Sequence, residues 1–319
     1  MKKRTSLFIF LCFLLVVFFA SFSISGFLVD KHAAEDTNTK KNNPVEISPP
    51  ANNENSEAAS NPSKAQTPQD NNTPDNNASA IAIYDILGTS NKLTQKEKLA
   101  MDKWRNDIVE FAKKNTGAMF VNGSANRKVV ALTFDDGPDA NITPKILDVL
   151  KQNNTKASFF FIGEKVMENK DVVKRAYADG NLVLSHSFNH PDLSTKSESV
   201  IDKQMKDTET AIYNIIGKKP ALMRPPYGNT NDLILKVAAR NNLKIVIWSI
   251  DTLDWSQKEK ANITKNVLDN VRPGEIILMH SNEDKKTTLE ALPDIINGLK
   301  DKGYSIVTLS ELLGVNAYK

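Results

Sequence analysis

The sequence has little of several features that would assign it to a class at once. It has one cysteine in 319 residues, Cys12, which excludes a disulfide-stabilised scaffold. It also lacks a charge excess, because 41 Lys and Arg residues face 38 Asp and Glu residues and the formal net charge is only +3. So small and mixed a charge argues against a nucleic-acid partner. The length allows one sizeable core with appended segments.

The longest uncharged run lies at the N-terminus. After a basic Lys-Lys-Arg stretch, Leu7 to Val29 carry no charge over 23 residues, which is long enough to span a bilayer. We favour an uncleaved signal anchor in residues 1–30, because a signal peptide has a shorter apolar core of ~7 to 15 residues. The basic N-terminus is expected to remain in the cytoplasm. The rest would then be extracellular, as part of a single-pass membrane protein or, after cleavage, as a secreted one.

Residues 31–80 have the composition of a disordered linker. They contain eleven Asn and six Pro but no aromatic residue and no glycine, so they bury too little apolar surface to order themselves. A flexible coil of this length spans roughly 40 Å on average. Such a tether would let a domain search polymer outside the membrane, or serve only as a spacer.

Residues 81–126 predict a helical extension. Thr94 to Glu97 has the pattern of a capping box, and Trp104, Ile108, Phe111 and Ala112 follow at helical spacing, with Gly117 at the end. The sequence leaves open whether this extension packs on the main domain.

From residue 127 to 319, short apolar runs alternate with amphipathic helical segments. This pattern is typical of a parallel sheet covered by helices. About seven such units favour a small or incomplete β/α barrel, with a doubly wound open sheet as the alternative. The runs are Val129 to Phe134, Ala157 to Phe161, Leu182 to Leu184, Ala221 to Met223, Ile245 to Ile250, Glu275 to Met279 and Ser305 to Leu309.

Unusual polar residues follow five of these runs. Because active sites of β/α barrels assemble at the carboxyl ends of the strands, we expect these groups to converge. His186 and His190 are four residues apart and would share a metal ion if the turn between them is helix-like, with a carboxylate completing the site. A solvated loop is the alternative for these histidines, and simple turn chemistry is the alternative for Asp135 and Asp136.

The five groups, in this order, resemble the motifs of the polysaccharide deacetylases of carbohydrate esterase family 4. Each motif alone is weakly specific, but five in order are a strong signal. The likeness extends over roughly residues 127 to 312. The motifs are Thr133-Phe134-Asp135-Asp136-Gly137-Pro138, His186-Ser187-x-x-His190, Arg224-x-Pro226-Tyr227, Asp251-x-x-Asp254-Trp255 and Leu278-Met279-His280.

The resemblance implies a metal-dependent hydrolase. It implies that Asp136, His186 and His190 bind a divalent metal ion, commonly Zn²⁺ in this family. It further implies that Asp135 is the general base and His280 the general acid.

The resemblance also implies supporting roles for three residues. Arg224 would position Asp135, the backbone N–H of Tyr227 would help to hold an oxyanion, and Asp251 would tune His280. For Asp254, capping of the next helix and a role in the site are equally compatible with the sequence. Phe188, Tyr227 and Trp255 would suit stacking on sugar rings.

An exported, tethered domain with these residues suggests N-acetylglucosamine in peptidoglycan as the substrate. Chitin oligomers, O-acetylated xylan and muramic acid are alternatives within the family. A non-catalytic wall-binding module and a zinc-storing or zinc-sensing protein are alternatives from other classes. The presence of every implied ligand, base and acid favours the enzyme.

Overall fold

A computed structural model describes residues 82–319, which belong to one compact unit. The predicted anchor in residues 1–30 and the predicted linker in residues 31–80 fall outside the described residues. Among the helices of the described part, none combines the length and hydrophobicity needed to cross a bilayer.

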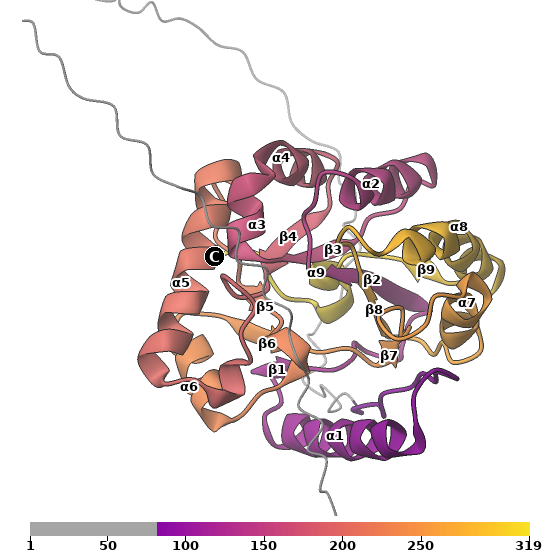
Figure 1. The fold of residues 1–319 in the computed structure, drawn as a ribbon, viewed down its shortest axis with the longest axis horizontal. Coiled ribbons are helices and arrows are strands. Elements are labelled where there is room, and N and C mark those ends of the chain that lie inside the picture. Colours follow the sequence, from indigo (N-terminus) through magenta and orange to yellow (C-terminus); the bar gives the residue numbers. More distant parts are fainter. Residues whose placement is uncertain (1–81) are drawn as a thin grey trace, which may run out of the picture. The chain divides into compact units, whose positions relative to one another are not determined.

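A curled sheet of short parallel strands forms the centre of the domain (Figure 1). The strand order is β1-β6-β5-β4-β3-β2-β8-β7, and β9 pairs with β2 beside this path. The strands are β1 (Met119–Phe120), β2 (Val129–Asp135), β3 (Ser158–Phe161), β4 (Leu182–Ser185), β5 (Leu222–Met223), β6 (Lys244–Val246), β7 (Ile250–Asp251), β8 (Ile276–His280) and β9 (Ser305–Ile306).

Strand β2 lies in the middle of the sheet and is buried throughout. Its residues alternate between two hydrophobic clusters, because successive side chains of a strand point to opposite faces. Ala131 belongs to the cluster on the concave side, whereas Leu132 and Phe134 pack against the outer helices. The side chain of Asp135 therefore points to the concave face, as those of Ala131 and Thr133 do.

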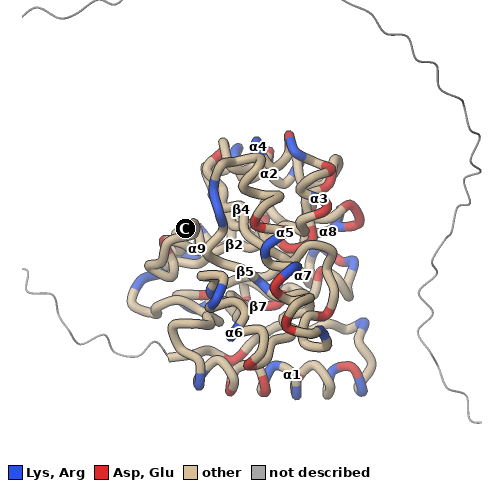
Figure 2. The backbone as a smooth tube through the Cα atoms, turned by 90° about the vertical axis from the view of Figure 1, so that its left-hand side faces the viewer, with Lys and Arg blue, Asp and Glu red and all other residues tan. Residues whose placement is uncertain are grey.

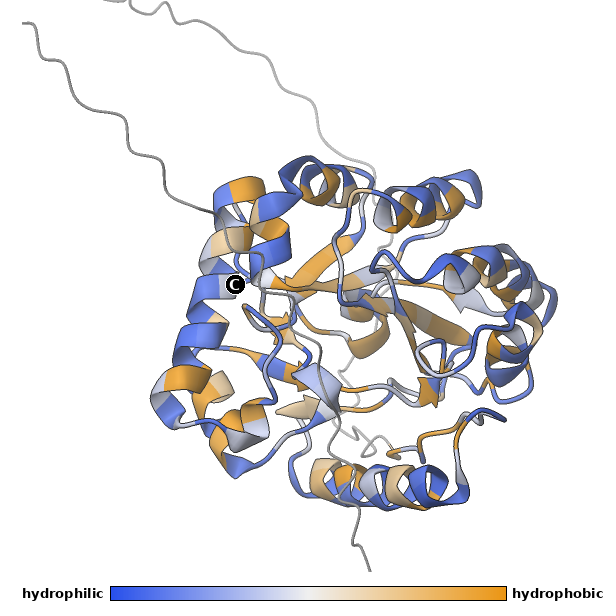
Figure 3. Cartoon of the chain, in the orientation of Figure 1, coloured by the Kyte–Doolittle hydropathy of each residue, from blue (hydrophilic) through white to orange (hydrophobic). Residues whose placement is uncertain are grey.

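The helices cover the outside of the sheet. Figure 3 shows mostly hydrophobic strands, surrounded by helices that are hydrophobic toward the sheet and hydrophilic outward. Charges of both signs are interspersed along the chain, as on α1 in Figure 2. The helices are α1 (Gln95–Lys114), α2 (Ile142–Gln152), α3 (Gly163–Glu168), α4 (Lys170–Ala178), α5 (Glu198–Ile216), α6 (Asp232–Arg240), α7 (Lys260–Leu268), α8 (Lys286–Asp301) and α9 (Leu309–Leu313).

The parallel α/β architecture is confirmed, but one expected strand is divided in two. The run Ile245 to Ile250 forms the end of β6 and the start of β7. The N–H of Ile247 donates to Phe120 on β1, whereas the N–H of Ser249 donates to Ile276 on β8. Strand β6 lies next to the edge strand β1, and β7 is the opposite edge, so successive parts of one chain segment come close to both edges. The sheet therefore curls into an incomplete barrel that is open at this seam.

The extension before residue 127 packs on the domain at the seam. Leu87 pairs with Ile250 on one side, and β1 pairs with β6 on the other. Helix α1 connects these two points and lies below β1 and β7 in Figure 1. The capping box of Thr94 and Glu97 is present, although α1 ends at Lys114 and not at Gly117.

Burial of α1 predicts that it unfolds together with the barrel. Ile108 on α1 is 5% exposed and packs in the inner cluster. We expect Ile108→Ala to lower the free energy of unfolding by about 2 to 5 kcal/mol. Denaturant unfolding followed by circular dichroism and tryptophan fluorescence would measure this change. Leu99→Ala is the matched control, because Leu99 is exposed and its loss should cost less than about 0.5 kcal/mol. A separate, earlier transition for Trp104 fluorescence would contradict the prediction.

Candidate active site

The motif residues from five strand ends meet in one cavity of about 400 Å³. The parallel strands bring their carboxyl ends to the same rim, as in other β/α barrels. Asp136, His186, His190, Tyr227, Asp251 and His280 all line this cavity, together with Met101, Trp104, Asn229, Trp248, Trp255 and Leu278.

Asp136, His186 and His190 form a cluster with the geometry of a metal site. Asp136 Oδ1 lies 3.4 Å from His186 Nε2 and 3.2 Å from His190 Nε2. One ligand atom from each residue lies within 4.8 Å of the others. Two imidazoles and one carboxylate suit a zinc-type ion and leave a coordination position open.

Two features of this cluster fit a bound cation. His186 Nδ1 lies 2.7 Å from the carbonyl oxygen of Arg224, so Nδ1 carries the proton and Nε2 keeps its lone pair for a metal. Asp136 Oδ1 is buried and has no hydrogen-bond partner.

Asp135 is held beside this cluster by Arg224. Arg224 Nη1 donates to Asp135 Oδ1 at 2.7 Å, and the other oxygen, Oδ2, lies 3.8 Å from His186 Nε2. The implied positioning contact between Arg224 and Asp135 is therefore present. Adjacent aspartates point in different directions, so Asp136 faces the two histidines while Asp135 pairs with the guanidinium.

The guanidinium of Arg224 is completely buried and donates four hydrogen bonds, one of them to Asp135. Its Nε donates to the carbonyl of Val246 and its Nη2 to that of Ile247, while Nη1 also donates to Thr133 Oγ1. The ring of Phe160 stacks on it at 4.3 Å. A buried cation that is held by four hydrogen bonds, one of them to a carboxylate, has little freedom to move.

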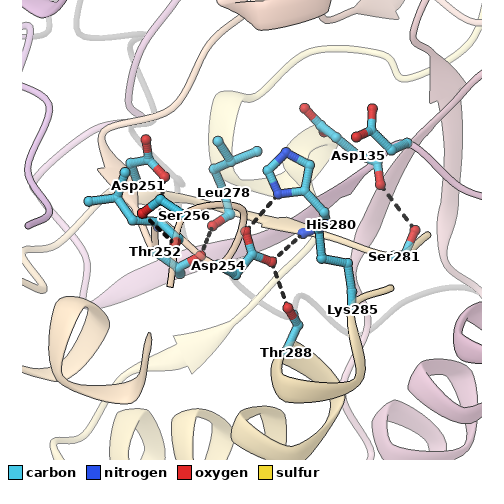
Figure 4. A network of polar contacts seen from close by, with 12 residues as sticks. Asp135, Asp251, Thr252, Asp254, Ser256, Leu278, His280, Ser281, Lys285 and Thr288 are labelled. Carbon is cyan, nitrogen blue, oxygen red and sulfur yellow. Dashed lines mark hydrogen bonds and ion pairs between the residues drawn. The ribbon is translucent and has the colours of Figure 1, made fainter. Parts of the chain in front are cut away.

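His280 is bound by Asp254 and not by Asp251, contrary to the implied tuning role of Asp251. His280 Nδ1 donates to Asp254 Oδ1 at 2.7 Å, and the backbone N–H of His280 donates to Asp254 Oδ2 at 2.8 Å. Thr288 Oγ1 donates to the same Oδ2 at 2.7 Å. Figure 4 shows the imidazole with Asp254 on one side and Asp135 on the other.

A turn explains why the first aspartate of the motif does not reach His280. Asp251 Oδ1 accepts a hydrogen bond from the N–H of Leu253, whose φ of 56° reverses the chain direction. This turn brings Asp254 against His280. Burial raises the pKa of Asp251, and the positive charge of Arg105 on α1 opposes that rise. Asp251 lines the cavity without a hydrogen bond to the imidazole.

Comparison with known proteins agrees with the motifs. The family model described as polysaccharide deacetylase matches residues 122–246. A peptidoglycan-N-acetylglucosamine deacetylase of Bacillus cereus is 42% identical over 193 residues, which are 60% of this chain and 70% of that protein. The chain belongs to the polysaccharide deacetylase family.

Two further relatives extend the comparison to a larger protein and to a crystal structure. The peptidoglycan-N-acetylglucosamine deacetylase PgdA of Listeria monocytogenes is 42% identical over 187 residues, 59% of this chain but only 39% of that protein. The crystal structure of the Bc1960 peptidoglycan N-acetylglucosamine deacetylase superposes with a TM-score of 0.64 at 39% identity, covering 66% of this chain and 99% of that one.

The backbone is strained around the cluster of Asp136, His186 and His190. Asp136, Ser187, His190, Tyr227 and Leu253 all have φ between 56° and 68°, a region that residues other than glycine rarely adopt. Strain of this kind collects at functional sites, where surrounding contacts enforce it. The motif sequence gives no sign of it.

Aromatic residues form the rim of the main cavity. Tyr227 is 60% exposed and meets His190 edge to face at 4.8 Å, and Trp255 is 48% exposed. Phe188, which we also expected to face the sugar, lines a separate cavity beside Met167. The sequence did not reveal that Met101, Trp104 and Trp248 line the main cavity, because helical periodicity alone does not distinguish a core face from a cavity wall.

The contact with Asp254 predicts a high pKa for His280. Burial alone would lower the pKa of this imidazole, but the charge and hydrogen bond of Asp254, with smaller effects of Asp136 and Asp135, raise it to about 9. Asp254→Asn removes the nearest negative charge, so we expect the pKa to fall by about 1 to 3 units. NMR titration of the imidazole would measure it.

Asp251→Asn is the matched control for this titration, because Asp251 does not contact the imidazole. It should lower the pKa of His280 by less than Asp254→Asn does. An equal or larger effect of Asp251→Asn would restore the role that the family resemblance implied for Asp251.

Proposed function

We propose that the protein hydrolyses the N-acetyl group of N-acetylglucosamine residues in peptidoglycan and releases acetate in a metal-dependent reaction. The observation that carries this proposal is the arrangement of the metal-type cluster, with Asp135 and His280 beside it in one cavity. Family membership supports deacetylation. The names of the relatives from Bacillus cereus and Listeria support peptidoglycan as the substrate class.

Asp135 is suited to act as the general base. A divalent metal ion, preferably Zn²⁺, held by Asp136, His186 and His190 would polarise the amide carbonyl and acidify a water molecule. Asp135 Oδ2 would accept a proton from the attacking water, because Oδ1 is engaged by Arg224. Fixing one oxygen leaves the other in a defined direction, which favours proton transfer.

His280 is suited to protonate the leaving amine. An amine is a poor leaving group unless it is protonated, so the reaction needs an acid on that side of the substrate. Asp254 holds Nδ1–H, which directs the Nε2–H away from Asp254. With a pKa raised to about 9, the imidazole is protonated at neutral pH and loses that proton only as the pH rises through this value.

Tyr227 is our candidate for the oxyanion donor. It lies in the cavity wall beside His190, on a turn with φ of 61° after β5. Its backbone N–H would stabilise the negative charge that develops on the carbonyl oxygen during attack. Because this donor belongs to the backbone, its position depends on the turn and not on the side chain.

Substitution of the base and the acid tests this function. We expect Asp135→Asn and His280→Ala each to lower the rate of acetate release by roughly 10²- to 10⁴-fold. The assay measures acetate released from N-acetylglucosamine polymers by the full-length protein in mild detergent. Asp171→Asn is the matched control, since Asp171 on α4 is fully exposed and should not affect the rate. Near-normal rates in both test variants would overturn the assignment.

Metal removal distinguishes this enzyme from the other classes of protein. Chelation should abolish acetate release, and added Zn²⁺ should restore it. A wall-binding module or a zinc-storing protein would bind glycan or metal without releasing acetate under any of these conditions. The same assay on chitin oligomers, acetylated xylan and peptidoglycan that retains only muramic acid acetyl groups would rank the alternative substrates.

We also propose that the N-terminal apolar segment anchors the protein in the cell membrane, with the catalytic domain outside. The support is the uncharged run of 23 residues after a basic N-terminus. The full-length protein should fractionate with membranes and be digested by protease added to intact, wall-free cells. Recovery of the protein in the medium without its N-terminal apolar segment would show that the segment is cleaved.

A further inference from the structure

Helix α1 contributes side chains to the wall of the active-site cavity. Met101 and Trp104 line the same cavity as Asp136, His190 and His280, although α1 lies outside the matched family segment 122–246. Both side chains are half-buried. The assigned catalytic and metal-binding roles use neither of them.

Trp104 is held in a fixed position by residues of the catalytic loops. Its ring stacks on Trp248 with 5.4 Å between the centroids, and its Nε1–H donates to Asn229 Oδ1 at 3.0 Å. Asn229 in turn donates to Asp192 Oδ2 at 3.0 Å. The side chain is therefore ordered before any ligand binds, which reduces the entropy cost of binding.

Gly228 allows this close approach of α1. It has φ of +68°, and a Cβ at this position would lie 2.7 Å from both Trp104 and Trp248. A methyl group would therefore push the two indoles away from the turn that carries Tyr227. The backbone of the proposed oxyanion donor and the α1 wall are fitted together at this glycine.

A second cavity continues from the first along α1. It has a volume of about 360 Å³ and shares Trp104 and Asn229 with the active-site cavity. Its other lining residues are Asp107, Ile108, Phe111, Ser194 and Thr230. The hydrogen-bonded pair of Trp104 and Asn229 thus lies at the boundary of the two cavities, because both residues line each of them.

We propose that Met101 and Trp104 form a binding subsite for a sugar ring that neighbours the deacetylated residue in the same glycan chain. This inference rests on the proposed function. A polymer whose acetamido group lies at the metal cluster must place its next ring beside it, and the second cavity continues the path. A pyranose presents C–H groups on its faces and hydroxyls at its edge, which suits an indole and a thioether beside the polar Asn229.

Two substrates separate this subsite from the catalytic centre. The first is the tetramer of N-acetylglucosamine, and the second is 4-nitrophenyl acetate, an acetate ester with no neighbouring sugar. With the full-length protein, we expect Met101→Ala and Trp104→Ala each to raise KM for the tetramer about 3- to 10-fold, with little change in kcat. Hydrolysis of the ester should be affected much less than that of the tetramer, because the ester has no neighbouring sugar to bind at this wall. Trp104→Phe should show an intermediate effect on KM and covers the case in which Trp104→Ala does not fold.

Leu99→Ala is the control on the same helix, because Leu99 is exposed and does not line the cavity. It should leave both substrates unaffected. An unchanged KM for the tetramer in the folded variants, or an equal loss on both substrates, would overturn the subsite while the proposed function stands. Failure of the wild-type protein to release acetate from the tetramer would instead overturn the proposed function, and the subsite with it.

Discussion

The buried contact between Arg224 and Asp135 is the constraint on which the site depends. A guanidinium removed from water needs hydrogen-bond partners, and here they come from Thr133 and Asp135 on β2 and from the carbonyls of Val246 and Ile247. The same cation therefore fixes the orientation of the proposed base and occupies carbonyls at the point where β6 and β7 separate. Loss of one member of such a pair strands a buried charge, which typically costs 3 to 5 kcal/mol. The seam of the barrel and the position of Asp135 are thus maintained by one side chain.

Much of the fold and of the metal cluster was predictable, because it depends on periodicity and on strand ends. The buried apolar runs predicted the strands, and the rule that parallel strands end at one rim predicted that the polar groups converge. The family resemblance then implied that Asp136, His186 and His190 are the metal ligands. The partner of His280 was not predictable in the same way. Asp251 and Asp254 differ in role because of the dihedral angles at Leu253, and those angles leave no mark in a single sequence. Likewise, β1 is only two residues long and owes its existence to pairing with β6.

Helix α1 illustrates a different limit of sequence reasoning. Its capping box and apolar face were readable, since both follow from local spacing. The location of α1 was not predictable. It depends on the gap between β6 and β7, and the sequence predicted one continuous strand over both of them. In the folded chain, Ile108 packs against the inner cluster while Trp104 extends past it to the cavity. A segment that would be taken for an appendage therefore shapes the surroundings of the catalytic groups.

The steric fit at Gly228 couples the evolution of α1 to that of the turn after β5. Because a Cβ at this position would lie 2.7 Å from both Trp104 and Trp248, a larger residue fits only if both indoles give way. In homologues that lack a helix in the place of α1, only Trp248 would restrict the size of the residue at position 228. Positions 104 and 228 should consequently change together during divergence, and their joint variation would reveal which members of the family carry this helix against the barrel.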